Sequence, residues 1–298
     1  MTAPRNPGRL RSMEITNREV EANGWRFRCR EAGPSGEPVI LLHGFPESSR
    51  MWSGLMTALS DHGYHCIAPD QRGYSPGARP EPVDAYRYED LAADALAIPR
   101  ALGFERFHLI AHDWGAIAGW AALSVDPRPV ASFTSLSIPH YAACALAVRD
   151  DPEEAPYRGI LDVLLSPDDG GDAAFSANDY AFLRLAWTES TPDEIEDYLS
   201  VFSQPGALHA AINWYRACNG HARALDDDSF VFGPVSTPTL LLWGKDDPYV
   251  RRMAFDLAPP HMTGPYRTVE VDAGHWLVQE ARDAVAGEAF AHLGTNPI

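Results

Sequence analysis

The segment from Leu109 to Gly115 places an acidic residue where covalent chemistry can occur. It reads Leu-Ile-Ala-His-Asp-Trp-Gly, an apolar run entering a turn with Asp113 at its tip and a small residue, Ala111 or Gly115, two positions to either side. A carboxylate held at such a turn can attack a saturated carbon and form an alkyl ester, which water must then hydrolyse. An aspartate at the end of a strand also commonly caps the following helix. The partners of Asp113 therefore decide between the two interpretations.

Two further motifs follow apolar runs near the C-terminus and could supply those partners. Asp247 lies in Gly-Lys-Asp-Asp-Pro, just after the apolar run 239–243, and His275 lies in Asp-Ala-Gly-His-Trp, just after the run 266–271. A histidine oriented by a carboxylate can remove a proton from the water that attacks the ester. Asp246 is an open alternative to Asp247, and a solvated acidic turn is the structural alternative for both.

The three motifs, taken in this order, resemble the α/β-hydrolase superfamily, in which a strand, a tight turn and a helix form the nucleophile elbow. With an aspartate at the elbow, the chain resembles the branch that contains epoxide hydrolases and haloalkane dehalogenases. The sequence His-Asp-Trp-Gly around that aspartate resembles that of the epoxide hydrolases. The resemblance covers residues 25–140 and 229–298. It implies that Asp113 is the nucleophile, Asp247 the triad acid and His275 the base.

The resemblance also implies an oxyanion hole made of two backbone N–H groups. One would come from Phe45, in His-Gly-Phe-Pro after the apolar run 38–42, and the other from Trp114. Two such donors suit the charge that develops when water attacks the carbonyl carbon of the aspartyl ester. The Phe45–Pro46 bond is expected to be cis on the same grounds.

Opening an epoxide generates an alkoxide, which needs an acid. In the family that this chain resembles, two tyrosines of a helical cap donate to the epoxide oxygen. The segment Asn-Trp-Tyr-Arg at 213–216 resembles the one that bears the second of them, which makes Tyr215 the first choice. Tyr157, in Ala-Pro-Tyr-Arg, is chosen as the other by its place early in the cap, with Tyr180 as the fallback. Packing within a cap helix is the structural alternative for each.

A haloalkane or haloacid dehalogenase with the same Asp-His-Asp triad is the second hypothesis. It would hold a halide on indole or amide N–H groups, and Trp114 suits this role as well as lining an apolar pocket. Phe45 stands where many dehalogenases have an asparagine donor, although Trp187 or Trp214 could replace that donor. The side chains predicted to contact substrate are Phe45, Trp114, Trp187, Trp214 and Trp276.

A ligand receptor without catalysis on the same fold is the third hypothesis, and the intact residues Asp113, Asp247 and His275 argue against it. A serine esterase is disfavoured because the tip of the elbow carries no hydroxyl group.

The elements that must position these residues alternate between strand and helix from residue 38 to about residue 140, which predicts βαβ units and a parallel sheet. Residues 141–228 are helical and loop-like with several prolines, and strand character returns at 239–243 and 266–271. The predicted fold is an α/β-hydrolase fold with a mostly parallel sheet flanked by helices. Its core would comprise residues 13–140 and 229–298, with an inserted helical cap at 141–228 and a flexible tail at 1–12.

Composition narrows the range of partners. The 298 residues carry a formal net charge of −17, which disfavours nucleic acid and anionic membranes as partners. No apolar run reaches the roughly 18 residues of a membrane span. Four cysteines without CxxC spacing favour a reducing, cytoplasmic location. The histidines show no HxH or HExxH spacing and no phosphate loop is present, so no metal and no cofactor are expected. The expected partner is a small apolar or neutral epoxide, bound by a monomer or homodimer.

Overall fold

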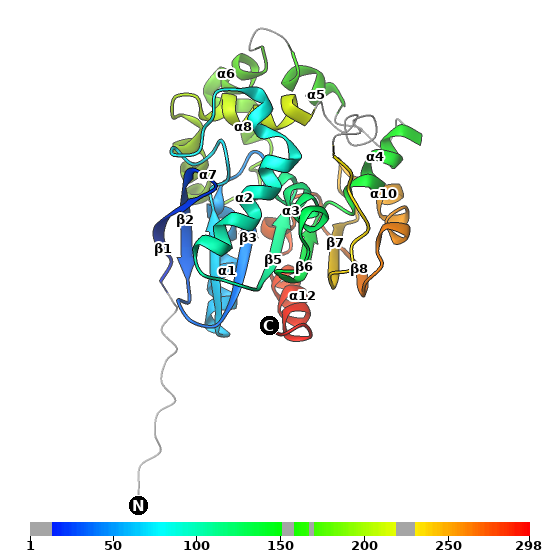
Figure 1. Cartoon of the computed structure of the whole chain (residues 1–298). Helices are drawn as coiled ribbons and strands as arrows, with labels where there is room; N and C mark the ends of the chain where they lie inside the picture. The colour runs from blue at the N-terminus through cyan, green and yellow to red at the C-terminus, as the bar shows by residue number, and fades with distance from the viewer. Residues whose placement is uncertain (1–13, 151–157, 167–169, 219–229) are drawn as a thin grey trace, which may run out of the picture.

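A central sheet organises the molecule (Figure 1). The computed structural model describes residues 14–150, 158–166, 170–218 and 230–298, and these form an 8-stranded sheet in the order β1-β2-β4-β3-β5-β6-β7-β8. The β1–β2 and β2–β4 pairs are antiparallel and the remaining pairs are parallel, which confirms the predicted sheet. The strands are β1 (Thr16–Ala22), β2 (Trp25–Ala32), β3 (Glu37–Leu42), β4 (Tyr64–Pro69), β5 (Phe107–His112), β6 (Val130–Leu136), β7 (Thr239–Gly244) and β8 (Tyr266–Val271).

The central strands are rich in apolar residues and lack the regular polar alternation of a half-exposed strand. Every residue of β4, β5, β6 and β7 is buried, as expected for strands covered by helices on both faces. The edge strand β8 is instead mostly exposed. Helices α2 and α3 pack together in front of the sheet in Figure 1, and α1 and α12 pack together behind it.

The helices of the core surround the sheet. Their bounds are η1 (Ser49–Trp52), α1 (Ser53–Asp61), η2 (Val83–Tyr86), α2 (Tyr88–Ala101), α3 (Trp114–Val125), α10 (Arg252–Asp256), η5 (Pro259–His261), α11 (Leu277–Glu280) and α12 (Arg282–Gly294). Among them, α3 follows β5 with only Asp113 between, so the turn that carries Asp113 joins a buried strand directly to a buried helix.

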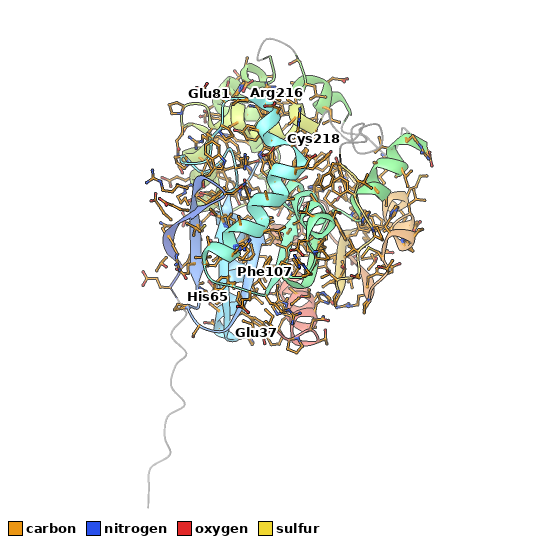
Figure 2. The ribbon with its side chains drawn as sticks, in the orientation of Figure 1. Glu37, His65, Glu81, Phe107, Arg216 and Cys218 are labelled. Carbon is orange, nitrogen blue, oxygen red and sulfur yellow. The ribbon has the colours of Figure 1, made fainter. Side chains whose placement is uncertain are left out.

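The segment predicted to be a cap is helical. It contains α4 (Tyr141–Asp150), α5 (Arg158–Leu164), α6 (Gly170–Arg184), α7 (Pro192–Phe202) and α8 (Ala207–Cys218). Helices α5 to α8 lie at one end of the sheet, whereas α4 packs beside α10 of the core (Figure 1). Figure 2 shows Glu37 and Phe107, at the amino ends of β3 and β5, at the end of the molecule far from this cap. The carboxyl ends of the parallel strands therefore face the cap.

The four cysteines are buried and form no disulfide. Across the ranges 14–150, 158–166, 170–218 and 230–298, no helix combines the length and the apolar character that crossing a membrane requires.

Candidate active site

Asp113 occupies a backbone conformation that aims its side chain out of the turn. Its φ is 50° and its ψ is −125°, and its side chain makes no capping hydrogen bond to α3. A residue other than glycine held there costs on the order of 1–3 kcal/mol, which typically marks a functional site. Gly115 allows the tight turn, because a Cβ at that position would lie 2.2 Å from the carbonyl oxygen of Leu42. This geometry does not support the helix-capping alternative.

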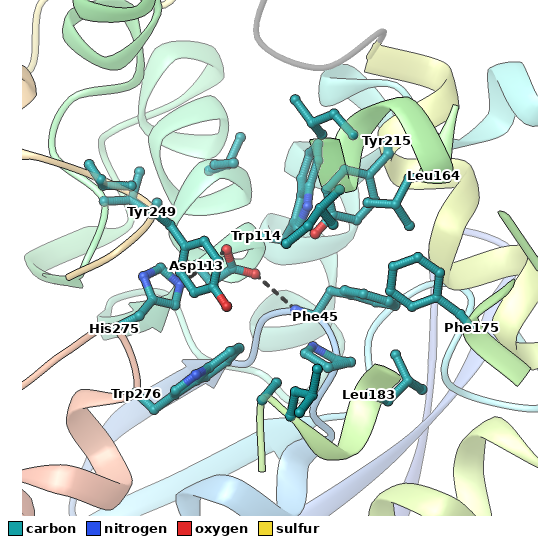
Figure 3. A pocket seen from close by; sticks show the side chains of 18 of the residues that line it. Phe45, Asp113, Trp114, Leu164, Phe175, Leu183, Tyr215, Tyr249, His275 and Trp276 are labelled. Carbon is teal, nitrogen blue, oxygen red and sulfur yellow. Dashed lines mark hydrogen bonds and ion pairs between the residues drawn. The ribbon is translucent and has the colours of Figure 1, made fainter. Parts of the chain in front are cut away.

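A backbone donor holds one oxygen of the Asp113 carboxylate. The N–H of Phe45 donates to Oδ1 at 2.9 Å (Figure 3). A hydrogen bond from the backbone of Trp114 is among the causes that lower the pKa of this carboxyl group. Phe45 and Trp114, the two residues predicted to supply oxyanion donors, therefore both lie beside the predicted nucleophile. The Phe45–Pro46 peptide bond is cis, as the resemblance implied.

The other carboxylate oxygen faces His275. The distance from His275 Nε2 to Asp113 Oδ2 is 3.5 Å, and His275 Nδ1 lies 2.8 Å from Asp247 Oδ2. The second oxygen of Asp247 accepts hydrogen bonds from the N–H groups of Tyr249, at 2.7 Å, and Val250, at 3.0 Å. Asp246, the open alternative, is exposed and has no such place beside the histidine. The structure thus brings together the three residues that the sequence predicted to act as a triad.

The two carboxylates set the charge of the histidine. Burial alone would lower the pKa of His275, but the negative charges of Asp247 and Asp113, with their hydrogen bonds, raise it to about 10. Burial alone would raise the pKa of Asp113, whereas its hydrogen bond to His275 and the nearby positive charge bring that pKa below its usual value. The resting site therefore holds an ion pair between Asp113 and His275 at neutral pH.

Tyr215 reaches the site from the cap helix α8. Its ring makes edge-to-face contacts with Phe45, at 5.5 Å between centroids, and with Trp114, at 4.9 Å. Burial and the negative charge of Asp113 raise the pKa of the phenol well above its usual value, so it remains a hydrogen-bond donor. Tyr157 lies outside the described residues. The fallback Tyr180 donates its hydroxyl to the carbonyl oxygen of Phe202 at 3.3 Å and does not line the cavity described next.

A mostly apolar cavity of about 190 Å³ lies over Asp113, between core and cap (Figure 3). Its wall includes three residues predicted to contact substrate, Phe45, Trp114 and Trp276, together with Tyr215 and His275. The other lining residues beside Asp113 are Pro46, Ile117, Ile138, Tyr141, Ile160, Leu161, Leu164, Phe175, Phe182, Leu183, Leu185, Ala186, Tyr249 and Val250. Its volume and lining suit a small apolar molecule.

Two predicted contact residues lie elsewhere. The indole N–H of Trp187 donates to the carbonyl oxygen of Pro46 at 3.0 Å, and that of Trp214 donates to the carbonyl oxygen of Arg72 at 2.9 Å. Both side chains are buried and neither lines the cavity. A buried indole N–H needs an acceptor, and these carbonyl groups supply it. The two hydrogen bonds therefore connect the cap to loops of the core.

A buried acid beside the triad is absent from the sequence-based prediction. Glu47 Oε1 accepts hydrogen bonds from Gln279 and Tyr198, while Oε2 lies 3.8 Å from Nδ1 of His112. His112 Nε2 donates to the carbonyl oxygen of His275 at 2.9 Å, which leaves its Nδ1 as an acceptor. Burial raises the pKa of Glu47 to about 8 and lowers that of His112 to about 4. Both Glu47 and His112 are therefore neutral at neutral pH. The two residues are far apart in the sequence, so only the folded structure shows that they are neighbours.

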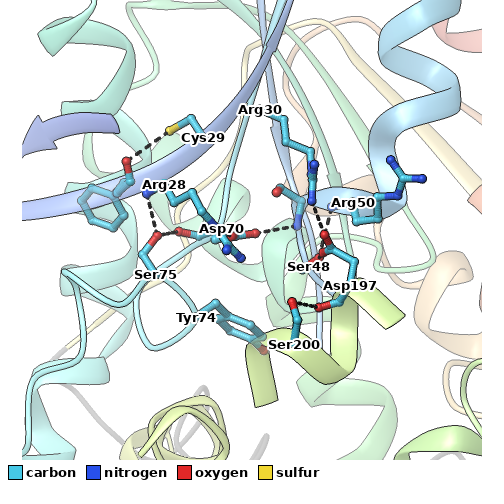
Figure 4. Close-up of polar contacts among 12 residues, drawn as sticks. Arg28, Cys29, Arg30, Ser48, Arg50, Asp70, Tyr74, Ser75, Asp197 and Ser200 are labelled. Atoms are coloured by element: carbon cyan, nitrogen blue, oxygen red, sulfur yellow. Dashed lines mark hydrogen bonds and ion pairs between the residues drawn. The ribbon is translucent and has the colours of Figure 1, made fainter. Parts of the chain in front are cut away.

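Two acidic residues fix the loop that carries Phe45 (Figure 4). Asp70 accepts a hydrogen bond from the N–H of Ser49 at 2.9 Å. Asp197, on the cap helix α7, accepts one from the hydroxyl of Ser48 at 2.7 Å and forms an ion pair with Arg30 of β2. The loop is thereby tied to both the sheet and the cap, which keeps the Phe45 N–H in place.

The described residues contain no group of three or more histidine, cysteine or acidic side chains arranged to hold a metal ion.

Comparisons with known proteins identify the family. The family model described as the α/β hydrolase fold matches residues 37–281. Epoxide hydrolase A of Mycobacterium tuberculosis is 32% identical over 322 residues, which cover 93% of this chain and 97% of that protein. The chain belongs to the α/β-hydrolase fold family.

Within this family the chain is epoxide hydrolase-like. Mouse epoxide hydrolase 4 is 29% identical to it over 92% of this chain and 78% of its own length. The crystal structure of epoxide hydrolase A from Mycobacterium thermoresistibile superposes with a TM-score of 0.72 at 29% identity, covering 96% of this chain and all of that one (100%).

Proposed function

We propose that this hydrolase opens an oxirane to a vicinal diol through a covalent ester on Asp113. The observation that carries the proposal is the state of the Asp113 carboxylate. The N–H of Phe45 holds one of its oxygens at 2.9 Å, and the other oxygen faces a mostly apolar cavity beside His275. A carboxylate in that position suits attack on carbon better than general acid or base work, since His275 already fills the latter role.

In the first step, Asp113 Oδ2 attacks an oxirane carbon. The carbon–oxygen bond of the ring breaks, and the oxygen takes a proton from the phenol of Tyr215. The enzyme is then an alkyl ester of Asp113, and the substrate carries a new hydroxyl group. Tyr215 suits this step because it lines the cavity above Asp113 and remains protonated at neutral pH.

In the second step, His275 removes a proton from water, and the hydroxide attacks the carbonyl carbon of the ester. The N–H groups of Phe45 and Trp114 stabilise the resulting oxyanion. The ester bond then breaks, and the diol leaves with the proton that His275 took from the water. The new carboxyl group of Asp113 retains one oxygen atom of the water and loses its proton to solvent. The Tyr215 phenolate regains a proton from solvent, which restores both groups.

Formation of the ester also changes the protonation state of His275. While Asp113 is ionised, its charge and hydrogen bond help to raise the pKa of His275. Alkylation removes that negative charge, so the pKa of His275 falls, the imidazolium releases its proton to solvent, and the neutral imidazole becomes available as a base. The base is thus freed at the point in the cycle where it is needed. When the Asp113 carboxylate is restored, His275 takes a proton from solvent again.

Parallel assays with one terminal epoxide and one primary bromoalkane test the proposal against dehalogenation. We expect diol from the epoxide and no bromide release from the bromoalkane, since the indoles of Trp187 and Trp214 are bonded to backbone carbonyls. Bromide release without diol formation would refute the proposal.

Tyr215→Phe tests the acid directly. The substitution keeps the ring contacts and removes a hydrogen bond to a developing charge, so alkylation should slow by roughly 10- to 150-fold. Tyr266→Phe is the matched control, because Tyr266 is exposed on the edge strand β8 and does not line the cavity.

A further inference from the structure

A third tyrosine lies in the cavity, on the core side. Tyr249 follows the triad acid by two residues, and its backbone N–H donates to Asp247 Oδ1 at 2.7 Å. Its ring meets that of His275 edge to face at 4.9 Å between centroids. The triad itself therefore fixes both the backbone and the ring plane of Tyr249.

The phenol of Tyr249 extends toward Asp113. Figure 3 shows it reaching from the core loop to the carboxylate, while Tyr215 comes down from the cap on the other side of the cavity. The two phenols also influence each other, because negative charge on Tyr249 is among the causes that raise the pKa of Tyr215. The remaining tyrosine among the described residues of the wall is Tyr141, whose hydroxyl accepts a hydrogen bond from that of Tyr88.

Tyr249 keeps its proton at neutral pH and can therefore donate a hydrogen bond. Burial raises the pKa of its phenol, and the negative charges of Asp247 and Asp113 raise it further. When Asp113 attacks, negative charge moves from that carboxylate to the oxygen of the opening ring. A phenol beside Asp113 then gains its strongest hydrogen bond in the transition state, as a catalytic donor must.

We propose that Tyr249 is a catalytic residue that donates a hydrogen bond to the oxirane oxygen together with Tyr215, so that one donor comes from the core and one from the cap. This inference rests on the proposed epoxide hydrolase function. Tyr215 transfers its proton, and Tyr249 shares the charge of the leaving oxygen without changing its own protonation. The hydrogen bond from Tyr249 would come from the core, so it would not depend on the position of the cap.

Two other roles make different predictions. If Tyr249 only positions His275, its hydroxyl serves ester hydrolysis and not alkylation. If Tyr157 of the cap is the second donor, Tyr249→Phe leaves both steps unchanged and Tyr157→Phe slows alkylation.

Stopped-flow fluorescence with excess enzyme and styrene oxide separates the two steps, since Trp114 and Trp276 line the cavity. The set comprises the wild-type protein, Tyr249→Phe, Tyr157→Phe and the control Tyr266→Phe, which lies on the edge strand β8 outside the cavity. Each protein is checked for its melting temperature. We expect Tyr249→Phe to slow alkylation by roughly 10- to 150-fold and to change ester hydrolysis by less than about threefold. Fluorotyrosine at position 249, with its more acidic phenol, should restore alkylation and move the alkaline limb of its pH profile downward.

Wild-type alkylation in Tyr249→Phe would overturn the inference, whether or not ester hydrolysis slows. Failure of the proposed function looks different, because the wild-type protein itself would then form neither ester nor diol. If Tyr249→Phe does not fold, the protein with fluorotyrosine at position 249 provides the test. An alkaline limb of its alkylation pH profile that does not move would overturn the inference.

Discussion

Replacing Gly44 by alanine adds one methyl group at the point where the oxyanion loop meets the nucleophile. A Cβ at position 44 would lie 2.4 Å from both Cβ and Oδ1 of Asp113. Ordinary carbon contacts are roughly 3.5–4.0 Å, so Asp113 or the loop must move by about 1 Å. The Asp113 backbone can yield little, because it is held between a buried strand and a buried helix.

A displacement of about 1 Å at a reacting group can cost on the order of 100-fold in rate, equivalent to about 2.7 kcal/mol of barrier. Overpacking of this kind costs about 1–3 kcal/mol of folding stability. We therefore expect Gly44→Ala to remain folded with a lowered melting temperature and to lose about 100-fold in kcat/KM for an epoxide.

Gly287→Ala is the matched control. Gly287 lies in α12 with nothing within 4 Å of a Cβ, so alanine there should leave activity unchanged. Steady-state kinetics and thermal unfolding of both variants complete the comparison. A folded Gly44→Ala protein with kcat/KM within threefold of wild type would refute the placement of the carboxylate against the loop.

Two further predictions concern protonation. In Asp113→Asn the pKa of His275 should fall below its wild-type value of about 10, because one of the two carboxylates that raise it is gone; an unchanged imidazole titration by NMR would contradict the ion pair. Glu47 keeps its proton in the folded protein up to about pH 8 but loses it near pH 4.5 when unfolded, so wild-type stability should decline as pH rises between these values. Glu47→Gln lacks this titration, and its deficit in melting temperature relative to wild type should shrink from pH 5 to pH 8; a constant deficit would show that Glu47 is ionised in the folded protein.

Sequence patterns predicted the sheet and the meeting of Asp113, Asp247 and His275. The reason is geometric: in a parallel sheet, the loops after successive strands gather at one edge, so motifs that follow strands must approach one another. Local motifs also sufficed for Phe45 and Trp114, because their contribution comes from the backbone of tight turns.

The cap was harder to predict from sequence. Whether an indole faces a cavity or a backbone carbonyl depends on side-chain rotamers and on how helices pack, and neither leaves a periodic signal. For this reason the sequence did not show that Trp187 and Trp214 donate to backbone carbonyls and do not line the cavity. Tyr249 was missed for a related reason, since the motif that identifies Asp247 says nothing about the direction of a side chain two residues later. Glu47 and His112 likewise meet only through the fold.

A single turnover in ¹⁸O-water tests the covalent role of Asp113 most directly. With enzyme in excess over epoxide, the oxygen that enters the diol comes from the old Asp113 carboxylate, and the heavy oxygen remains on the enzyme. Mass spectrometry of the digested protein should find the label in the peptide with Asp113, none in the peptide with Asp247, and none in the first diol released. Heavy oxygen in that first diol, with an unlabelled Asp113 peptide, would mean that water attacks the epoxide directly and would contradict the covalent mechanism.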